Sequence, residues 1–127
     1  MDNGKLMELS RQAQAGAYAP YSGFKVGAAL LTNTGKVYTG ANIENASYGL
    51  TVCAERIAVF KAINDGEKEF DRLAVTASSG WPYPCGACRQ VLAEFSPHMT
   101  VIISDENNCT REYLLTELLP HIFSLDI

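Results

Sequence analysis

The chain alternates short apolar runs with turn-forming residues, a pattern that predicts helices and strands in alternation. Apolar runs over 26–31 and 37–41 flank a glycine-containing turn over 32–36, which predicts a β-hairpin with a buried first strand. An amphipathic helix is expected before the hairpin, ending in the Ala-Pro-Tyr-Ser-Gly segment of 19–23. Its apolar face carries four residues at helical spacing: Leu6, Leu9, Ala13 and Ala17.

After the hairpin, the pattern predicts two helices that both begin at cysteines. In chain order, the remaining expected elements are a largely buried helix over 53–63, a strand over 73–77, a helix with Cys88, Val91, Leu92 and Phe95 on one face, strands over 100–104 and 111–114, and a short helix near 116–119. Together they predict a single domain over 1–127 of the α/β class. We expect a three-layer α/β/α sandwich with a central mixed five-stranded sheet.

The composition narrows the classes of function. With 127 residues, 47% of them hydrophobic and 19% charged, the chain can bury a core in one domain. Its net charge of -4 and its scattered Lys and Arg give no basic footprint, so we expect no nucleic-acid polymer as partner. No apolar segment has bilayer-spanning length and no secretory signal is visible. We therefore expect a cytoplasmic protein that does not bind membranes.

Three of the four cysteines occur in two short motifs, Cys-Ala-Glu over 53–55 and Pro-Cys-Gly-Ala-Cys over 84–88. Three thiolates converging from two helix N-termini can bind zinc and leave its fourth position open, which is the pattern of a catalytic site. Glu55 stands in a first helical turn, where a carboxylate can act on metal-activated water rather than on the metal. The sequence therefore predicts three zinc ligands: Cys53, Cys85 and Cys88.

Taken alone, Cys85 and Cys88 are equally typical of a redox pair or of half a structural zinc knuckle. A closed structural site needs a fourth Cys or His ligand, and the candidates are Cys109, His98 and His121. None of these three lies in a paired knuckle. The Cys-Ala-Glu motif favours catalysis, and we interpret Cys109 as a small residue of a polar turn or a strand without a role in metal binding.

Three motifs resemble the small, homotetrameric type of cytidine deaminase in the cytidine/deoxycytidylate deaminase superfamily. They are Cys-Ala-Glu-Arg over 53–56, Pro-Cys-Gly-Ala-Cys-Arg-Gln over 84–90 and Asn-Ile-Glu-Asn-Ala over 42–46. The zinc motifs are shared across the superfamily, whereas the 42–46 motif and the segment 19–24 narrow the resemblance to enzymes of nucleosides. The likeness runs from about Ala17 to Phe123, nearly the whole chain.

The resemblance implies hydrolysis of cytidine and 2′-deoxycytidine to uridine and 2′-deoxyuridine with release of ammonia, a reaction of pyrimidine salvage. It implies one Zn²⁺ per chain, a zinc-bound hydroxide that attacks C4, and Glu55 as the proton shuttle. Arg56 is expected to hydrogen-bond the cysteine sulfurs and to offset the charge that three thiolates donate to the metal.

The resemblance also implies a substrate-binding set and an assembly. Asn42 and Glu44 would bond the ribose 3′-hydroxyl, and Phe24 would pack against the pyrimidine. Tyr48 and Phe123 resemble residues that family members contribute across subunit boundaries. A homotetramer with active sites at subunit interfaces is therefore implied, with this substrate-binding set: Phe24, Asn42, Glu44, Ala54, Tyr48 and Phe123.

Residue patterns alone give each of these side chains an ordinary alternative. Phe24 opens a predicted buried strand and would be a core residue by periodicity. Asn42 and Glu44 are typical of turns and solvent-facing positions. Tyr48 and Phe123 are typical packing residues.

Two other functions stand as alternatives. The same zinc motif serves deaminases of blasticidin-type antibiotics or of a base within a polynucleotide. The 42–46 motif disfavours the first, and the acidic composition disfavours the second. A non-catalytic zinc-stabilised binding module would keep the fold but has no use for Glu55 beside an open metal position. The segments 51–52 and 79–83 match no pattern of the family, and Trp81 and Tyr83 carry no assigned role.

Overall fold

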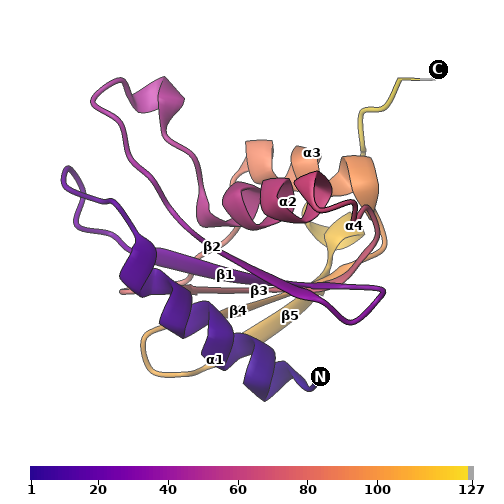
Figure 1. Ribbon diagram of the computed structural model, residues 1–127, viewed down its shortest axis with the longest axis horizontal. Helices are drawn as coiled ribbons and strands as arrows, with labels where there is room; N and C mark the ends of the chain where they lie inside the picture. Colours follow the sequence, from indigo (N-terminus) through magenta and orange to yellow (C-terminus); the bar gives the residue numbers. More distant parts are fainter. Residues whose placement is uncertain (126–127) are drawn as a thin grey trace.

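The computed structural model describes residues 1–125 and has three layers (Figure 1). Its elements are α1 (Asn3–Ala13), η1 (Gln14–Gly16), β1 (Val26–Thr32), β2 (Val37–Ala41), η2 (Tyr48–Leu50), α2 (Ala54–Asn64), β3 (Phe70–Ala77), α3 (Gly86–Phe95), β4 (Thr100–Ser104), β5 (Thr110–Leu114) and α4 (Leu115–Leu118). The middle layer is a five-stranded sheet in the order β2-β1-β3-β4-β5. The predicted α/β/α sandwich is confirmed.

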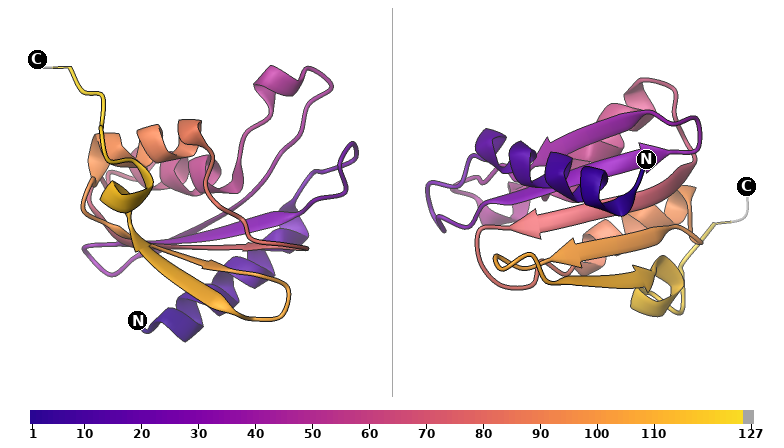
Figure 2. Two further views of the ribbon diagram at one scale, coloured as in Figure 1. Left: turned by 180° about the vertical axis from the view of Figure 1, so that it is seen from behind. Right: turned by 90° about the horizontal axis from the view of Figure 1, so that it is seen from below.

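The sheet is mixed. Strands β3 and β4 run parallel, while the other neighbouring pairs are antiparallel. Helix α1 lies on one face, and α2 and α3 lie on the opposite face, with α4 beside the end of β5 (Figure 2). Within the described residues, no helix combines the length and the apolar character that crossing a membrane requires.

Helix α1 is fixed to its face of the sheet by an apolar and a polar contact. Leu6 is completely buried in a small hydrophobic cluster between α1 and the sheet. The buried hydroxyl of Ser10 donates to the carbonyl oxygen of Gly27 in β1 at 2.8 Å. Because a buried hydroxyl must be hydrogen-bonded, this contact sets the position of α1 along β1.

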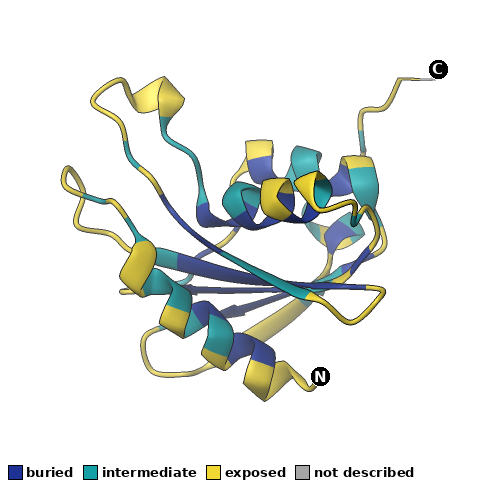
Figure 3. Ribbon diagram, viewed as in Figure 1, coloured by how far each residue is buried: buried dark blue, intermediate teal, exposed yellow. Residues whose placement is uncertain are grey.

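The main hydrophobic core lies between the sheet and helices α2 and α3 (Figure 3). It includes the completely buried Val59 of α2. Helix α2 comes very close to β2 at Gly40, where a Cβ would lie 2.4 Å from the carbonyl oxygen of Ala54 and 2.7 Å from the nitrogen of Ala58. Both are backbone atoms, so only glycine allows this approach. Gly40 therefore sets where the first turn of α2 stands.

The predicted helices and strands are present, with some shifted ends. The α1 helix ends at Ala13 and tightens into η1, so Ala17 lies beyond the helix. Strand β3 begins at Phe70, which is buried and pairs with Thr32 of β1. Phe24 stands two residues before β1 and is 37% exposed, so its interpretation as a core residue is wrong.

Candidate metal centre and substrate pocket

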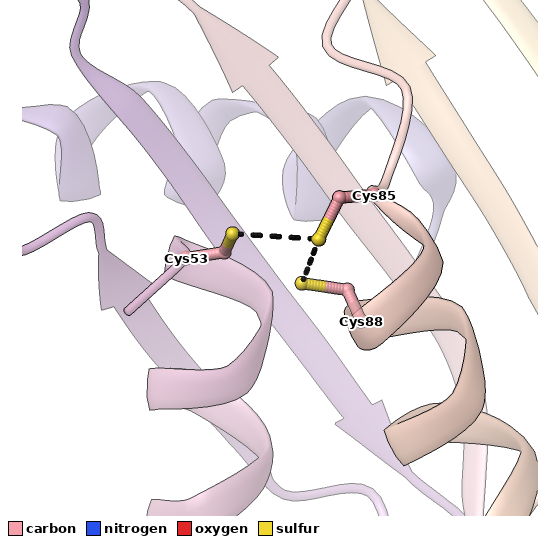
Figure 4. Close-up of side chains that lie close together, drawn as sticks. All are labelled: Cys53, Cys85 and Cys88. Carbon is pink, nitrogen blue, oxygen red and sulfur yellow. Dashed lines mark hydrogen bonds between the residues drawn. The ribbon is translucent and has the colours of Figure 1, made fainter. Parts of the chain in front are cut away.

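Three cysteine sulfurs meet where two helices begin (Figure 4). Cys53 directly precedes α2, Cys85 directly precedes α3, and Cys88 lies in the first turn of α3. The Sγ of Cys85 lies 3.7 Å from the Sγ of Cys53 and 3.4 Å from the Sγ of Cys88. All three sulfurs lie within 4.8 Å of one another. The structure thus brings together the three cysteines that the sequence singles out.

The spacing of these sulfurs fits zinc. A tetrahedral zinc ion bonds thiolate sulfur at about 2.3 Å, which places two bound sulfurs about 3.8 Å apart. Among residues 1–125, no further Cys, His, Asp or Glu joins this group, so Cys109, His98 and His121 are not ligands of it. A zinc ion held by three protein ligands keeps one position for a reactant.

Two features favour ionised sulfur here. The N-termini of α2 and α3 bring the positive ends of two helix dipoles to the cluster. The pKa of Cys53 is lowered to about 5, chiefly by a hydrogen bond from the Cys88 thiol and further by Arg56. The pKa of Cys88 is raised because it donates that hydrogen bond and is buried. In the metal-free cluster, Cys53 therefore ionises before Cys88.

Arg56 places a cation against this cluster. Its Nη2 donates to the Sγ of Cys53 at 3.6 Å and to the carbonyl oxygen of Thr51 at 3.4 Å. Its Nε is buried and has no hydrogen-bond partner in the part of the chain that the structure describes. The contact with sulfur that the sequence predicts for Arg56 is present.

Glu55 is buried in the first turn of α2, with only 4% of its surface exposed. Burial raises the pKa of its carboxyl to about 7, and the negative charge of Cys53 adds to the effect. The carboxylate does not belong to the group of ligating sulfurs, yet it lines the same cavity. A carboxyl whose pKa lies near neutrality can both take up and release a proton there.

A cavity of about 340 Å³ opens beside the sulfurs. Four of the six predicted substrate-binding residues line it: Phe24, Asn42, Glu44 and Ala54. Cys53, Glu55 and Cys85 line it as well. The fold therefore gathers the metal cluster, the buried carboxyl and the segments around 24, 42–44 and 54 around one volume.

Asn42 and Glu44 already hold the backbone that surrounds the cavity. The Asn42 Oδ1 accepts from the N–H of Val26 at 2.9 Å, and its Nδ2 donates to the carbonyl oxygen of Phe24 at 2.8 Å. The Glu44 Oε1 accepts from the N–H groups of Tyr21 and Ser22 at 3.0 and 3.1 Å. An amide NH₂ has two donors and Asn42 uses one here, so one remains for a ligand.

The structure does not bring Tyr48 and Phe123 into this cavity. Tyr48 lies in η2, is 80% exposed, and lines an adjoining hollow that also contains Glu44. Phe123 is 66% exposed, and its carbonyl oxygen accepts from Nε2 of Gln90 at 2.9 Å.

Sequence reasoning missed several residues that line the cavity. Pro82 and Tyr83 form part of its wall, and their place just before Cys85 is a signal that could have indicated this. The other missed lining residues are Ser22, Val26 and Thr51. Ser22 and Thr51 lie outside the regular helices and strands, and Val26 opens β1, so their places at the cavity follow from how distant segments meet in the fold.

The chain matches a known family over most of its length. The profile described as the cytidine and deoxycytidylate deaminase zinc-binding region matches residues 1–104. The chain belongs to this family. As a member of the cytidine and deoxycytidylate deaminase family, it is a zinc-dependent deaminase, and the cluster of Cys53, Cys85 and Cys88 is able to hold the metal ion.

Curated relatives and solved structures of the family match this chain over nearly its whole length. A cytidine deaminase of Halalkalibacterium halodurans is 50% identical over 128 residues, covering 99% of this chain and 97% of that protein. The crystal structure of a cytidine deaminase from Burkholderia pseudomallei has a TM-score of 0.93 and 47% identity, covering 97% of this chain and all of that one. A blasticidin-S deaminase of Bacillus cereus is 33% identical over 107 residues, covering 75% of this chain and 74% of that protein.

Proposed function

We propose that this protein deaminates cytidine and 2′-deoxycytidine hydrolytically, giving uridine or 2′-deoxyuridine and ammonia, as a single catalytic domain over 1–127. One observation carries the proposal: a buried carboxyl, Glu55, stands beside a cluster of three cysteines on the wall of a nucleoside-sized cavity. The full-length relatives named as cytidine deaminases support the choice of substrate.

Glu55 moves the protons of the reaction. It takes a proton from the attacking water and delivers it to N3 of the base. It then transfers the remaining hydroxyl proton to the amino group at C4, which leaves as ammonia, so that water and cytidine give uridine and ammonia. Zinc, when bound by the three cysteines, supplies a Lewis acid that lowers the pKa of water toward neutrality. Burial of Glu55 keeps its pKa near the value that suits both transfers.

The remaining lining residues orient the nucleoside. Asn42 and Glu44 offer hydrogen-bonding groups to the ribose 3′-hydroxyl, and Phe24 offers its ring to the pyrimidine. Ala54 is completely buried at the start of α2, where its small side chain leaves room for the base. Arg56 neutralises part of the thiolate charge through its contact with Cys53.

The protein works as a homotetramer in this proposal. Tyr48 and Phe123 reach the active sites of neighbouring subunits, since neither lies in the cavity of its own chain. Support comes from large apolar side chains that the single chain leaves exposed, among them Ile43, Tyr48 and Leu50. A reducing compartment such as the cytoplasm suits a cluster of three cysteines that must stay unoxidised for the metal to bind.

The test measures ammonia release and the ultraviolet change on adding cytidine, with zinc quantified per chain in the same sample. Turnover of cytidine and 2′-deoxycytidine at about one zinc per chain supports the proposal. Stoichiometric zinc with turnover of blasticidin S alone would overturn the nucleoside assignment. Zinc without turnover of any of these compounds would favour a binding module.

A further inference from the structure

One wall of the substrate cavity is built by a segment that the proposed chemistry does not use. Residues 78–84 lead from β3 to Cys85, and Pro82 and Tyr83 within them line the cavity. Pro82 is buried, whereas Tyr83 is 40% exposed. Trp81, just before them, is partly buried and packs against the main core.

This wall is held in place from β5. The guanidinium carbon of Arg111 lies 3.9 Å from the centre of the Trp81 ring, and Nη1 of Arg111 donates to the hydroxyl of Tyr83 at 2.8 Å. The hydroxyls of Tyr83 and Tyr113 also lie 2.8 Å apart, with the two rings tilted at a centroid distance of 5.8 Å. One planar guanidinium therefore ties two aromatic residues of the wall to the sheet, by stacking and by a charged hydrogen bond.

The hairpin between β4 and β5 adds a second tie. A carboxylate oxygen of Glu106 accepts from the backbone N–H of Gly80 at 2.6 Å. Gly80 has φ of 71°, a conformation that favours glycine. The segment that carries Pro82 and Tyr83 is thus anchored at several points rather than free to move away from the cavity.

The chemistry of the base indicates which of its edges meets this wall, and this step rests on the proposed function. In a pyrimidine ring, N3 and C5 flank C4 on opposite sides. With C4 at the sulfur cluster and N3 at Glu55 on α2, the C5 edge must face away from Glu55. The segment that leads into Cys85 and α3 reaches the cavity from the helix that does not carry Glu55.

We propose that Pro82 and Tyr83 form the surface that meets the C5 edge of the base, and that Arg111 is a positioning residue that fixes this surface. The pair sets how large a substituent at C5 of a cytosine nucleoside the enzyme accepts. Because this surface is bonded to β5, it does not move aside when a bulky halogen replaces hydrogen at C5. The substituted nucleoside therefore binds less favourably than cytidine.

The test compares kcat and KM for cytidine and 5-iodocytidine in the zinc-loaded protein and its variants. Arg111→Lys keeps the positive charge but removes the planar guanidinium that contacts Trp81 and Tyr83, and Tyr83→Ala removes the aromatic ring from the cavity wall. In both, we expect the ratio of kcat/KM for 5-iodocytidine to that for cytidine to rise about tenfold, the scale on which a pocket discriminates one small group. The KM for cytidine rises, and its kcat stays near that of the parent.

Arg72→Lys is the matched control, because Arg72 lies on β3 and bonds Asn3 rather than the wall. Zinc content and the melting temperature verify that each variant is folded, and Tyr83→Phe provides a milder second variant that keeps the ring. An unchanged ratio in folded variants of an active parent overturns the role of the wall while leaving the proposed function standing. A parent protein without activity on cytidine overturns both proposals.

Discussion

Arg56 and Cys53 are joined by a hydrogen bond from Nη2 of the arginine to the sulfur, over 3.6 Å. The two residues stand in sequence on either side of Ala54 and Glu55, so the N-cap and first turn of α2 together provide the ligand, the acid and the counter-cation. The cation lowers the electron density that the thiolate can give to a bound metal.

We expect Arg56→Gln to retain zinc and to lower kcat by about 10- to 100-fold, since a hydrogen bond to a charged group contributes about 1.5–3 kcal/mol and about 1.4 kcal/mol changes a rate tenfold. Steady-state kinetics with metal analysis checks this. Arg72→Gln, on β3 and outside the cavity, should keep the parental rate. Full activity of Arg56→Gln would mean that the two helix dipoles suffice.

Replacing Glu55 with Gln should remove turnover but not the metal. Without a group that accepts and returns the proton, kcat should fall by about 10³-fold, within the usual range for a general acid–base residue. The melting temperature should not fall, because burial disfavours the charged form of this carboxyl. Glu94→Gln, at an exposed position of α3, serves as the control. Loss of zinc from the Gln variant would contradict a purely proton-transferring role.

Thiol counting should separate the metal ligands from Cys109. In the zinc-loaded native protein, we expect a thiol reagent to modify about one cysteine quickly, the exposed Cys109, because metal-bound thiolates react slowly. After removal of zinc by a chelator, Cys53 and Cys85 should react as well. In the zinc-loaded Cys109→Ser variant, the reagent should modify almost no cysteine quickly. After removal of zinc, Cys53 and Cys85 of this variant should react as they do in the parent. Rapid modification of three thiols before chelation would show that the cluster does not hold metal.

The close approach of β2 to α2 gives a prediction on stability. A methyl group at position 40 would meet backbone atoms of Ala54 and Ala58, so we expect Gly40→Ala to lower the free energy of unfolding by about 1–3 kcal/mol. Because α2 must shift, kcat should fall too. In Gly16→Ala the new methyl meets only Cβ of Ala41 at 3.8 Å, an ordinary contact, so stability should change little. Thermal unfolding of both variants measures the difference.

Much of the fold could be predicted because its helices and strands have clear local signals. Strand β1 is apolar from Val26 onward, and both cysteine-bearing helices begin at a cysteine motif, the second of them directly after a proline break. The end of α1 was harder, because Ala17 continues the apolar spacing although η1 has already tightened the chain at Gln14. Periodicity does not record such tightening.

The site was predictable where chemistry requires a residue type at a fixed spacing, as for the three cysteines and Glu55. The contact between Arg111 and Tyr83 was not, because the two residues stand 28 positions apart and meet only when β5 pairs with β4. Phe24 illustrates the opposite case. Its periodicity indicated a core position, and only the backbone turn before β1 places it at the cavity.

Helix α1 lies on the face of the sheet opposite to α2 and α3 (Figure 1), and the cavity is lined at the starts of these two helices by Ala54, Glu55 and Cys85. No residue of α1 lines the cavity, and the hydrogen bond from Ser10 to Gly27 holds the helix against β1. Exposed positions of this helix, such as Glu8 and Gln12, are therefore suitable anchor points for immobilising the protein on a support or attaching a fluorophore. A molecule attached through these positions would have its cavity on the side away from the support. Nucleosides in solution would then reach the cavity without passing the point of attachment.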